Sequence, residues 1–150
     1  MDTLEFYLTE VEKLENGIID LQQVSINCDN VDLTNLEIEQ EKKITRLLDK
    51  AIKIAPNNPN LYLKKAQHLN SCPPFPNLLE ETSEILPLLD KAIEVDYNNA
   101  NSYFIKAEEL RKNFNKESIP SILACYDMAI KLEPNNGIYN MRKNNFLLRH

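Results

Sequence analysis

A short segment occurs three times in the chain and constrains its fold more than any other feature. Residues 47–58 read LLDKAIKIAPNN, residues 88–99 read LLDKAIEVDYNN, and residues 125–136 read CYDMAIKLEPNN. Each copy contains Ala-Ile, then another aliphatic residue two positions further on, and each ends in Asn-Asn. The copies begin 41 and 37 residues apart. A unit repeated in this way cannot bury its apolar side alone, so we expect the copies to stack into one continuous core.

The residues that end each copy predict a pair of antiparallel helices per repeat. Pro56 and Pro134 stop the helix that the copy forms, because proline cannot continue a helix. Asn58 and Asn99 are good helix N-caps. Pro59 follows at the first position of the next helix, where its missing N–H group costs nothing.

The helix that follows each of the first two copies is also repeated. Tyr62 and Ala66 follow the first copy at the same spacing as Tyr103 and Ala107 follow the second. A small Ala lets a neighbouring helix approach closely, and the Tyr fills the space beside it.

Further helices are expected at both ends of the chain. Apolar residues at helical spacing predict a long helix over about Asp2–Val24. Thr34–Glu37 reads as a capping box that opens the second helix, and Ser118 with Pro120 opens the last paired helix. Residues Gly137–His150 mix apolar residues with Asn, which suits a terminal helix with one solvated face.

These features resemble the tetratricopeptide repeat (TPR) family, in the Ala–Ile–aliphatic–Pro-Asn-Asn ending and in the Tyr and Ala of the next helix. The resemblance implies an all-α fold: a right-handed α-solenoid of antiparallel helix pairs, with about seven helices and about three degenerate repeats. The family's period is about 34 residues, so we expect the extra residues in the turns Ser71–Glu81 and Lys112–Ser118. One departure is Tyr97, which stands where the family usually has Pro.

A chain of 150 residues is long enough for one domain with a sizeable core. We expect a single TPR-like helical repeat domain over residues 1–150. It would comprise an N-terminal helix and loop (1–33), a repeat core (34–136) and a terminal capping helix (137–150).

Charge and composition exclude several classes of partner. The net charge is −6, and residues 1–43 hold 11 Asp and Glu against 3 Lys. An acidic chain gains nothing from releasing phosphate counterions, so no nucleic-acid partner is expected. No apolar stretch is long enough to span a membrane, and no secretory signal precedes the first helix, so we expect a cytoplasmic protein, with the nucleus as the other option.

No catalytic or metal-binding cluster is visible in the sequence. The cysteines Cys28, Cys72 and Cys125 are far apart, and the only histidines are His68 and His150, so neither a zinc site nor any cofactor is expected. His68 has no acidic residue on its own helix and is expected to be solvated or at the edge of the core. Phosphate-binding loops and nucleophile motifs do not occur, so the protein is not expected to be an enzyme.

The resemblance also implies where a partner would bind. In the family the first helix of each pair lines the concave face of the stack, where peptides usually bind. Matching the repeats by position gives three rows of candidate partner-binding residues: Leu63, Phe104 and Met141; Lys64, Ile105 and Arg142; Gln67, Glu108 and Asn145. An apolar row flanked by Lys and Arg would suit an amphipathic helix or an extended apolar segment with some acidic character. The same residues could instead belong to the core, or be covered by the N-terminal helix.

Some members of the family bind acidic carboxyl-terminal tails of chaperones through a clamp of Lys, Asn and Arg. Only Arg142 has that character at the corresponding positions here, so this specialised function is not expected. We expect a protein-binding adaptor or scaffold. The alternatives are a structural or self-associating subunit of a larger assembly, although the sequence does not indicate homo-oligomerisation, and a small acidic chaperone for an export client.

The segment Asn70–Asn77, NSCPPFPN, is the most unusual stretch of the chain. Its three Pro residues hold it extended, so it could present Phe75 to a partner. A rigid turn in which Phe75 packs against the neighbouring helices is the preferred interpretation.

Overall fold

The computed structural model describes residues 3–25, 31–71, 84–112 and 114–149, and the side chains of 3–17, 38–71, 84–112 and 114–149. This part of the chain forms seven α-helices and one 3-10 helix and contains no β-strand. The helices are α1 (Leu4–Ser25), α2 (Val31–Ile54), α3 (Pro59–Ser71), α5 (Ile85–Val95), α6 (Ala100–Lys112), η1 (Lys116–Ser118), α7 (Ile119–Leu132) and α8 (Gly137–Leu147).

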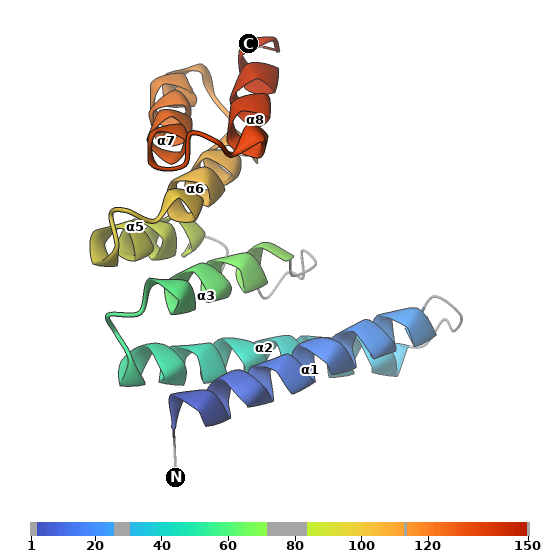
Figure 1. Cartoon of the computed structure of the whole chain (residues 1–150). Coiled ribbons are helices and arrows are strands. Elements are labelled where there is room, and N and C mark those ends of the chain that lie inside the picture. The colour runs from blue at the N-terminus through green and yellow to red at the C-terminus, as the bar shows by residue number, and fades with distance from the viewer. Residues whose placement is uncertain (1–2, 26–30, 72–83, 113, 150) are drawn as a thin grey trace.

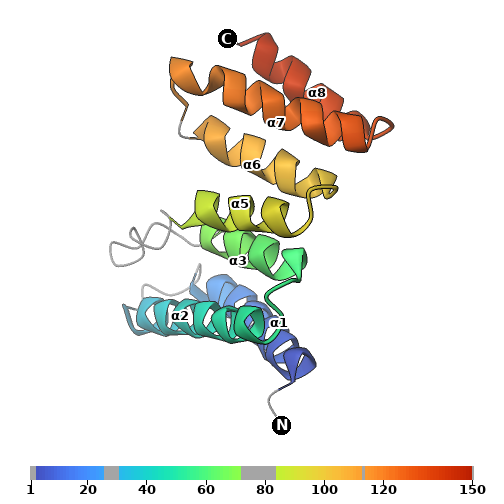
Figure 2. The same ribbon diagram turned by 90° about the vertical axis from the view of Figure 1, so that its left-hand side faces the viewer.

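The helices pack as consecutive pairs that stack along one axis (Figures 1 and 2). α1 packs against α2, α3 against α5, and α6 against α7, while α8 closes the stack against α7. The all-α solenoid of antiparallel helix pairs, with about seven helices, is therefore confirmed. The first pair is longer than the others, with 22 and 24 residues in α1 and α2 against 13 in α3. At ~1.5 Å per residue α1 is ~33 Å long and α3 ~20 Å, so the first pair extends beyond α3 (Figure 1).

The core repeats from one pair to the next, as the sequence repeat predicts. The second helix of each pair buries three residues on one side. They are an Ile, a large residue four positions later, and an Ala three positions after that. These buried residues are Ile44, Leu48 and Ala51 on α2; Ile85, Leu89 and Ala92 on α5; and Ile122, Tyr126 and Ala129 on α7. All three Ala residues have no exposed surface, so a larger side chain there would push the helices apart.

An ion pair joins each pair of helices to the first helix of the next. Lys65 on α3 lies 2.8 Å from Asp49, and Lys106 on α6 lies 2.5 Å from Asp90. Lys143 on α8 lies 2.5 Å from Asp127. The Asp belongs to the repeated segment and the Lys follows it by 16 residues in every case. This spacing was present in the sequence, but it could be recognised as a contact only once the stacking was known.

The junctions between pairs are closed by capping bonds of the expected kind. The side chains of Asn58 and Asn99 accept hydrogen bonds from backbone N–H groups at the starts of α3 and α6, at 3.1 and 3.2 Å. The Tyr62 hydroxyl donates to the Pro56 carbonyl at 2.7 Å, and the Tyr103 hydroxyl donates to the Tyr97 carbonyl at 3.2 Å. Because the bond uses a backbone carbonyl, Tyr97 can replace the usual Pro without losing it.

Two expected helix starts differ from the structure in detail. The capping box at Thr34 is wrong, because α2 already begins at Val31 and continues through Thr34 without a break. A mid-helix Thr costs less than ~0.7 kcal/mol, which packing along α1 can offset. Ser118 does precede α7, but its side chain makes no capping bond there and instead forms a reciprocal pair with Asn115 around η1.

Two expectations fall wholly or partly on residues that the structure does not describe. The turn Ser71–Glu81 and the Phe75 segment lie almost entirely outside the described residues. The turn Lys112–Ser118 lies between α6 and α7, as expected. The boundary expected after residue 33 falls inside α2, and the division of the chain otherwise stays a prediction.

Candidate protein-interaction face

The first helices of successive pairs, α1, α3, α6 and α8, lie side by side and form one face of the stack, here called the first-helix face. Lys64 on α3 forms an ion pair with Glu15 on α1 at 3.2 Å. Lys112 on α6 donates a hydrogen bond to the side chain of Asn70 on α3. The rings of Phe104 on α6 and Tyr139 on α8 are 4.8 Å apart between centroids. Each contact joins neighbouring first helices, so this face is continuous along the stack.

The row Leu63, Phe104 and Met141 passes from the core to the surface. Leu63 is only 5% exposed and belongs to the cluster between α3 and α5, so it offers little surface to a partner. Phe104 is half-buried and stacks on Tyr126 and Tyr139. Met141 is 52% exposed. Exposure therefore increases along this row from α3 to α8.

The second row is divided between internal contacts and the surface. Lys64 is half-buried and is held by Glu15. Ile105 is half-buried and packs against the α3–α5 cluster. Arg142 keeps 44% of its side chain exposed. Arg142 therefore has a more exposed side chain than Lys64, at 44% against 32%.

In the third row, Gln67 and Asn145 are exposed, whereas Glu108 is the centre of a polar cluster. The Tyr126 hydroxyl donates to Glu108 Oε1 at 2.5 Å. Arg111 Nη2 lies 3.0 Å and Arg142 Nη1 3.9 Å from Glu108 Oε2. Burial, reinforced by the Glu108 carboxylate, raises the pKa of Tyr126 above its ordinary value of 10.0. Glu108 is therefore a positioning residue that holds two arginines at the surface.

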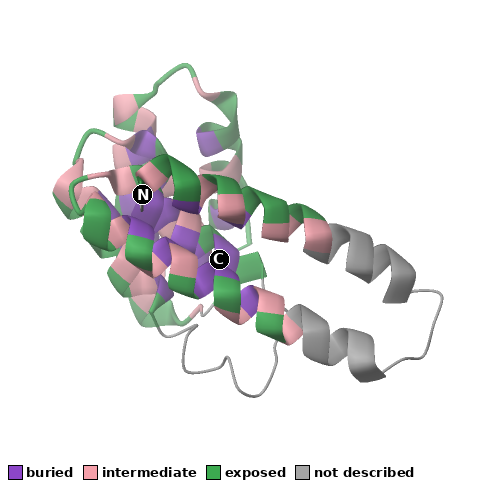
Figure 3. Cartoon of the chain, turned by 90° about the horizontal axis from the view of Figure 1, so that it is seen from below, coloured by how far each residue is buried: buried purple, intermediate pink, exposed green. Residues whose placement is uncertain are grey.

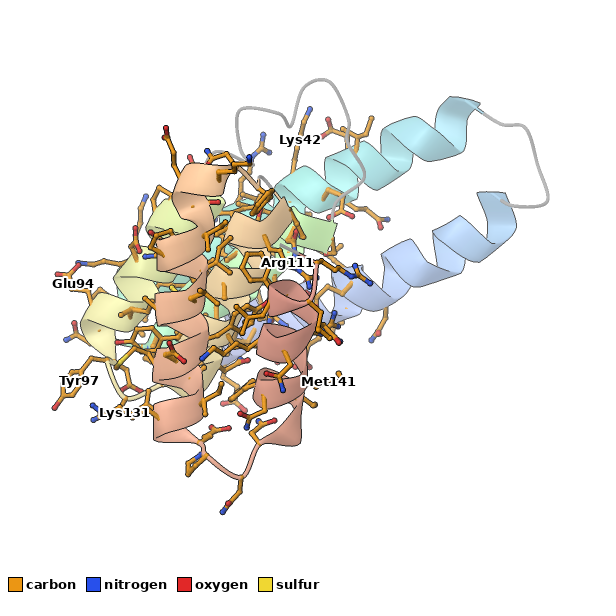
Figure 4. All side chains as sticks on the ribbon, turned by 90° about the horizontal axis from the view of Figure 1, so that it is seen from above. Lys42, Glu94, Tyr97, Arg111, Lys131 and Met141 are labelled. Carbon is orange, nitrogen blue, oxygen red and sulfur yellow. The ribbon has the colours of Figure 1, made fainter. Side chains whose placement is uncertain are left out.

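The structure adds two surface residues that the sequence reasoning missed. Ile138 is 56% and Leu148 85% exposed, and both lie on the same side of α8 as Met141. The positions 138, 141, 145 and 148 follow helical spacing, so a search for an exposed apolar stripe on the last helix would have found them. Figure 4 shows Met141 and Arg111 near α8, on the side of the molecule away from Glu94, Tyr97 and Lys131.

Two of the other titratable residues singled out in the sequence, His68 and Cys125, are buried. His68 is buried, and its Nε2 lies 3.2 Å from Glu41 on α2. The sequence could not show this carboxylate because it comes from another helix. Cys125 is buried, as expected, and burial raises the pKa of its thiol. Cys28 and Cys72 lie outside the described residues.

The described residues contain neither a candidate metal site nor a candidate membrane span. No group of three or more His, Cys, Asp or Glu side chains in this part of the chain could hold a metal ion. No described helix has the length and apolar character needed to cross a membrane.

Comparisons with known proteins bear on the fold. No protein-family model matches the sequence, and no curated protein matches it. The structure is similar to a solved structure described as "MamA RS-1 ArsTM double mutant", from a TPR-type protein, with a TM-score of 0.58 and 15% sequence identity. The match covers 99% of this chain and 85% of that one. At this identity the likeness shows a TPR-like fold, and membership of the family stays a prediction.

Proposed function

We propose that the protein is a non-catalytic interaction module that binds a peptide or helix of a partner protein on the first-helix face, at the end formed by α6 and α8. The observation that carries this proposal is the apolar stripe of Ile138, Met141 and Leu148, each more than half exposed. Large apolar side chains gathered on one side of a surface helix are typical of a binding site. Phe104 and Ile105 extend the apolar surface onto α6, although both are half-buried.

The charges beside the stripe indicate the character of the partner. Residues 137–150 contain no Asp or Glu, and Arg142 and Arg111 lie at the edge of the stripe, held by Glu108. A partner helix would match both the apolar stripe and the arginines if its apolar side chains contacted Met141 and an acidic residue lay near Arg142. The rigid stack holds these groups in place before binding, which limits the ordering cost. Lys64 and Gln67 would form the polar rim, and Asn145 a polar position within the stripe.

The proposal is tested by affinity capture from a cell lysate with matched variants of α8. Ile138→Glu/Met141→Glu places two charges on the stripe, whereas Asn140→Glu/Asn144→Glu places the same charges on another exposed side of the helix. Phe104 is left unchanged because its ring packs in the core. Circular dichroism must first show that both variants keep the wild-type helix content.

We expect proteins that bind the wild type and the Asn variant to be lost from the Ile138/Met141 variant. Equal capture by all three proteins would show that the stripe is not the binding site. The self-associating subunit and the export chaperone remain alternatives, and the first is taken up below on separate observations.

A further inference from the structure

A basic stripe runs along the outer side of α2 and is not part of the first-helix face. Lys43, Arg46, Lys50 and Lys53 follow one another at three- and four-residue intervals, so they share one side of the helix. All four are exposed, and none forms an ion pair within the described residues. Lys50 lies over the ring of Tyr7, 5.7 Å from its centroid. Four unpaired cations on one helix side are unexpected in a chain with a net charge of −6.

This stripe is specific to α2 and is not a consequence of the repeat. The corresponding positions are Glu84, Pro87, Lys91 and Glu94 in the second repeat, and Ser121, Ala124, Met128 and Lys131 in the third. In the second repeat Lys91 is paired with Glu94 at 2.9 Å. The packing between pairs therefore does not need the cations of α2.

The stripe lies on the side of α2 away from α3 and borders α1. The side of α2 that contacts α3 carries Glu41, which lies against His68, and Asp49, which pairs with Lys65. The four residues of the basic stripe lie together on a different side of α2. Lys43 and Arg46 also line a surface hollow of about 360 Å³ beside Leu14 of α1. Figure 3, which views this end of the stack, shows α1 and α2 side by side.

The matching acidic surface is on α1 of the same chain. Glu5 and Glu12 are exposed, lie on one side of α1 seven residues apart, and form no ion pair within the described part of the chain. Lys43 and Lys50 are also seven residues apart, as are Arg46 and Lys53. Two helices that lie alongside each other can therefore pair both glutamates with the stripe at two-turn intervals.

We propose that α1 of one copy of this chain docks on the α2 basic stripe of a second copy, through Glu5 and Glu12. Each copy carries the acidic surface and the basic stripe on different helices, so the contact is heterologous and adds copies head to tail. The contact is mainly charged, so it is weak and sensitive to salt. A second copy fits better than nucleic acid or a membrane, because Glu10 and Asp49 flank the narrow stripe and would repel a broad polyanion.

Charge reversal on each surface gives a direct test. Arg46→Glu/Lys50→Glu removes the net positive charge of the stripe, and Glu5→Lys/Glu12→Lys reverses the acidic surface. Lys116→Glu/Lys131→Glu is the matched control, because it changes the net charge like the first variant at exposed positions away from α2. Molar mass is measured by sedimentation equilibrium over a range of protein concentrations, at low and high salt.

The wild type and the control are expected to increase in average mass with concentration at low salt, and to return towards the monomer at high salt. Each variant alone should associate at least ~10-fold more weakly, because each pairing then brings at least one pair of like charges together. An equal mixture of the two variants should recover association, because the unchanged glutamates of the first variant meet the unchanged stripe of the second.

A wild type that stays monomeric at every concentration would overturn the proposal and leave an acidic segment of another protein as the occupant of the stripe. Association that the variants do not change, or a mixture that fails to recover it, would also overturn it. These outcomes are independent of the Ile138 and Met141 test, because the two surfaces lie at opposite ends of the stack.

Discussion

The two ends of the described stack expose different chemistry. At the C-terminal end, α8 exposes an apolar stripe and its sequence contains no acidic residue. At the N-terminal end, α1 and α2 expose separate acidic and basic side chains, with Phe6 and Ile54 as apolar exceptions at 48% and 46% exposure. An apolar end favours close contact with a partner that excludes water, whereas a charged end favours weak contacts that depend on salt.

A single position shows how the N-terminal end differs from the internal junctions. α1 matches α3 by placing Tyr7 and Val11 at the spacing of Tyr62 and Ala66. Glu10 then takes the place that Lys65 has on α3, and it pairs with Lys13 on its own helix at 2.8 Å. An Asp from another repeat would be repelled by the Glu10 carboxylate at this position. The Asp–Lys ion pair of the internal junctions is therefore not available at Glu10.

The largest expected effect is a difference in unfolding free energy between substitutions on the buried and the exposed side of α8. Phe146 is 1% exposed and packs against Phe114 and Tyr126. Phe146→Ala should lower the free energy of unfolding by ~3–5 kcal/mol, because it leaves a cavity between α8 and α7. Leu147→Ala, at a half-exposed neighbour, should change it by less than ~0.5 kcal/mol. Urea denaturation followed by circular dichroism measures both, and equal costs would mean that α8 does not anchor through Phe146.

The next effect compares the ion pair nearest the N-terminal end with the one nearest the C-terminal end. The Lys65 side chain is 8% exposed and contacts both Asp49 and Glu84, whereas that of Lys143 is 26% exposed and contacts Asp127. Lys65→Ala should cost ~1–3 kcal/mol of unfolding free energy, and Lys143→Ala less than ~1 kcal/mol. The same urea denaturation experiment measures both changes in unfolding free energy. A larger loss for Lys143→Ala than for Lys65→Ala would contradict the prediction.

A smaller effect tests the polar cluster that holds Arg142 near the apolar stripe. Tyr126→Phe removes the hydrogen bond to Glu108 and should cost ~1 kcal/mol near neutral pH. The pKa of Tyr126 is raised in the folded protein, so its contribution is complete below about pH 10 and is lost as the pH rises further. The variant should therefore lose less stability than the wild type above pH 10. Parallel pH profiles would mean that Tyr126 does not titrate with unfolding.

The smallest expected effect concerns the contact between α1 and α3. Glu15→Gln weakens the ion pair with Lys64, in which both side chains are about one-third exposed. The global free energy of unfolding should fall by less than ~0.5 kcal/mol. Amide hydrogen exchange in α1 should quicken while exchange in α7 stays unchanged. Equal acceleration in α7 would indicate that this pair stabilises the whole stack.

Repetition made most of the fold predictable. Three copies of one segment, with the Asn caps and Pro residues at their ends, predicted the helix pairs and their order. This was possible because these signals act within a few residues of one another. The predicted start of α2 was wrong because Thr34 has only a weak local preference for the N-cap position. The candidate face was less predictable. Leu63, Phe104 and Met141 are equivalent in sequence but range from buried to half-exposed, since exposure depends on what packs next to each helix.

The sequence by itself determined the helical repeat, the buried Ala of each second helix and the absence of a recognisable catalytic motif. These properties depend on residue type and on short spacings along the chain. Only the tertiary structure decided that Lys65, Lys106 and Lys143 join successive pairs and that Glu108 holds Arg142. It also decided that the four cations of the α2 basic stripe form no ion pair in the described chain. Side chains separated by many residues pair or stay apart according to how the helices stack, and stacking depends on all the packed surfaces together.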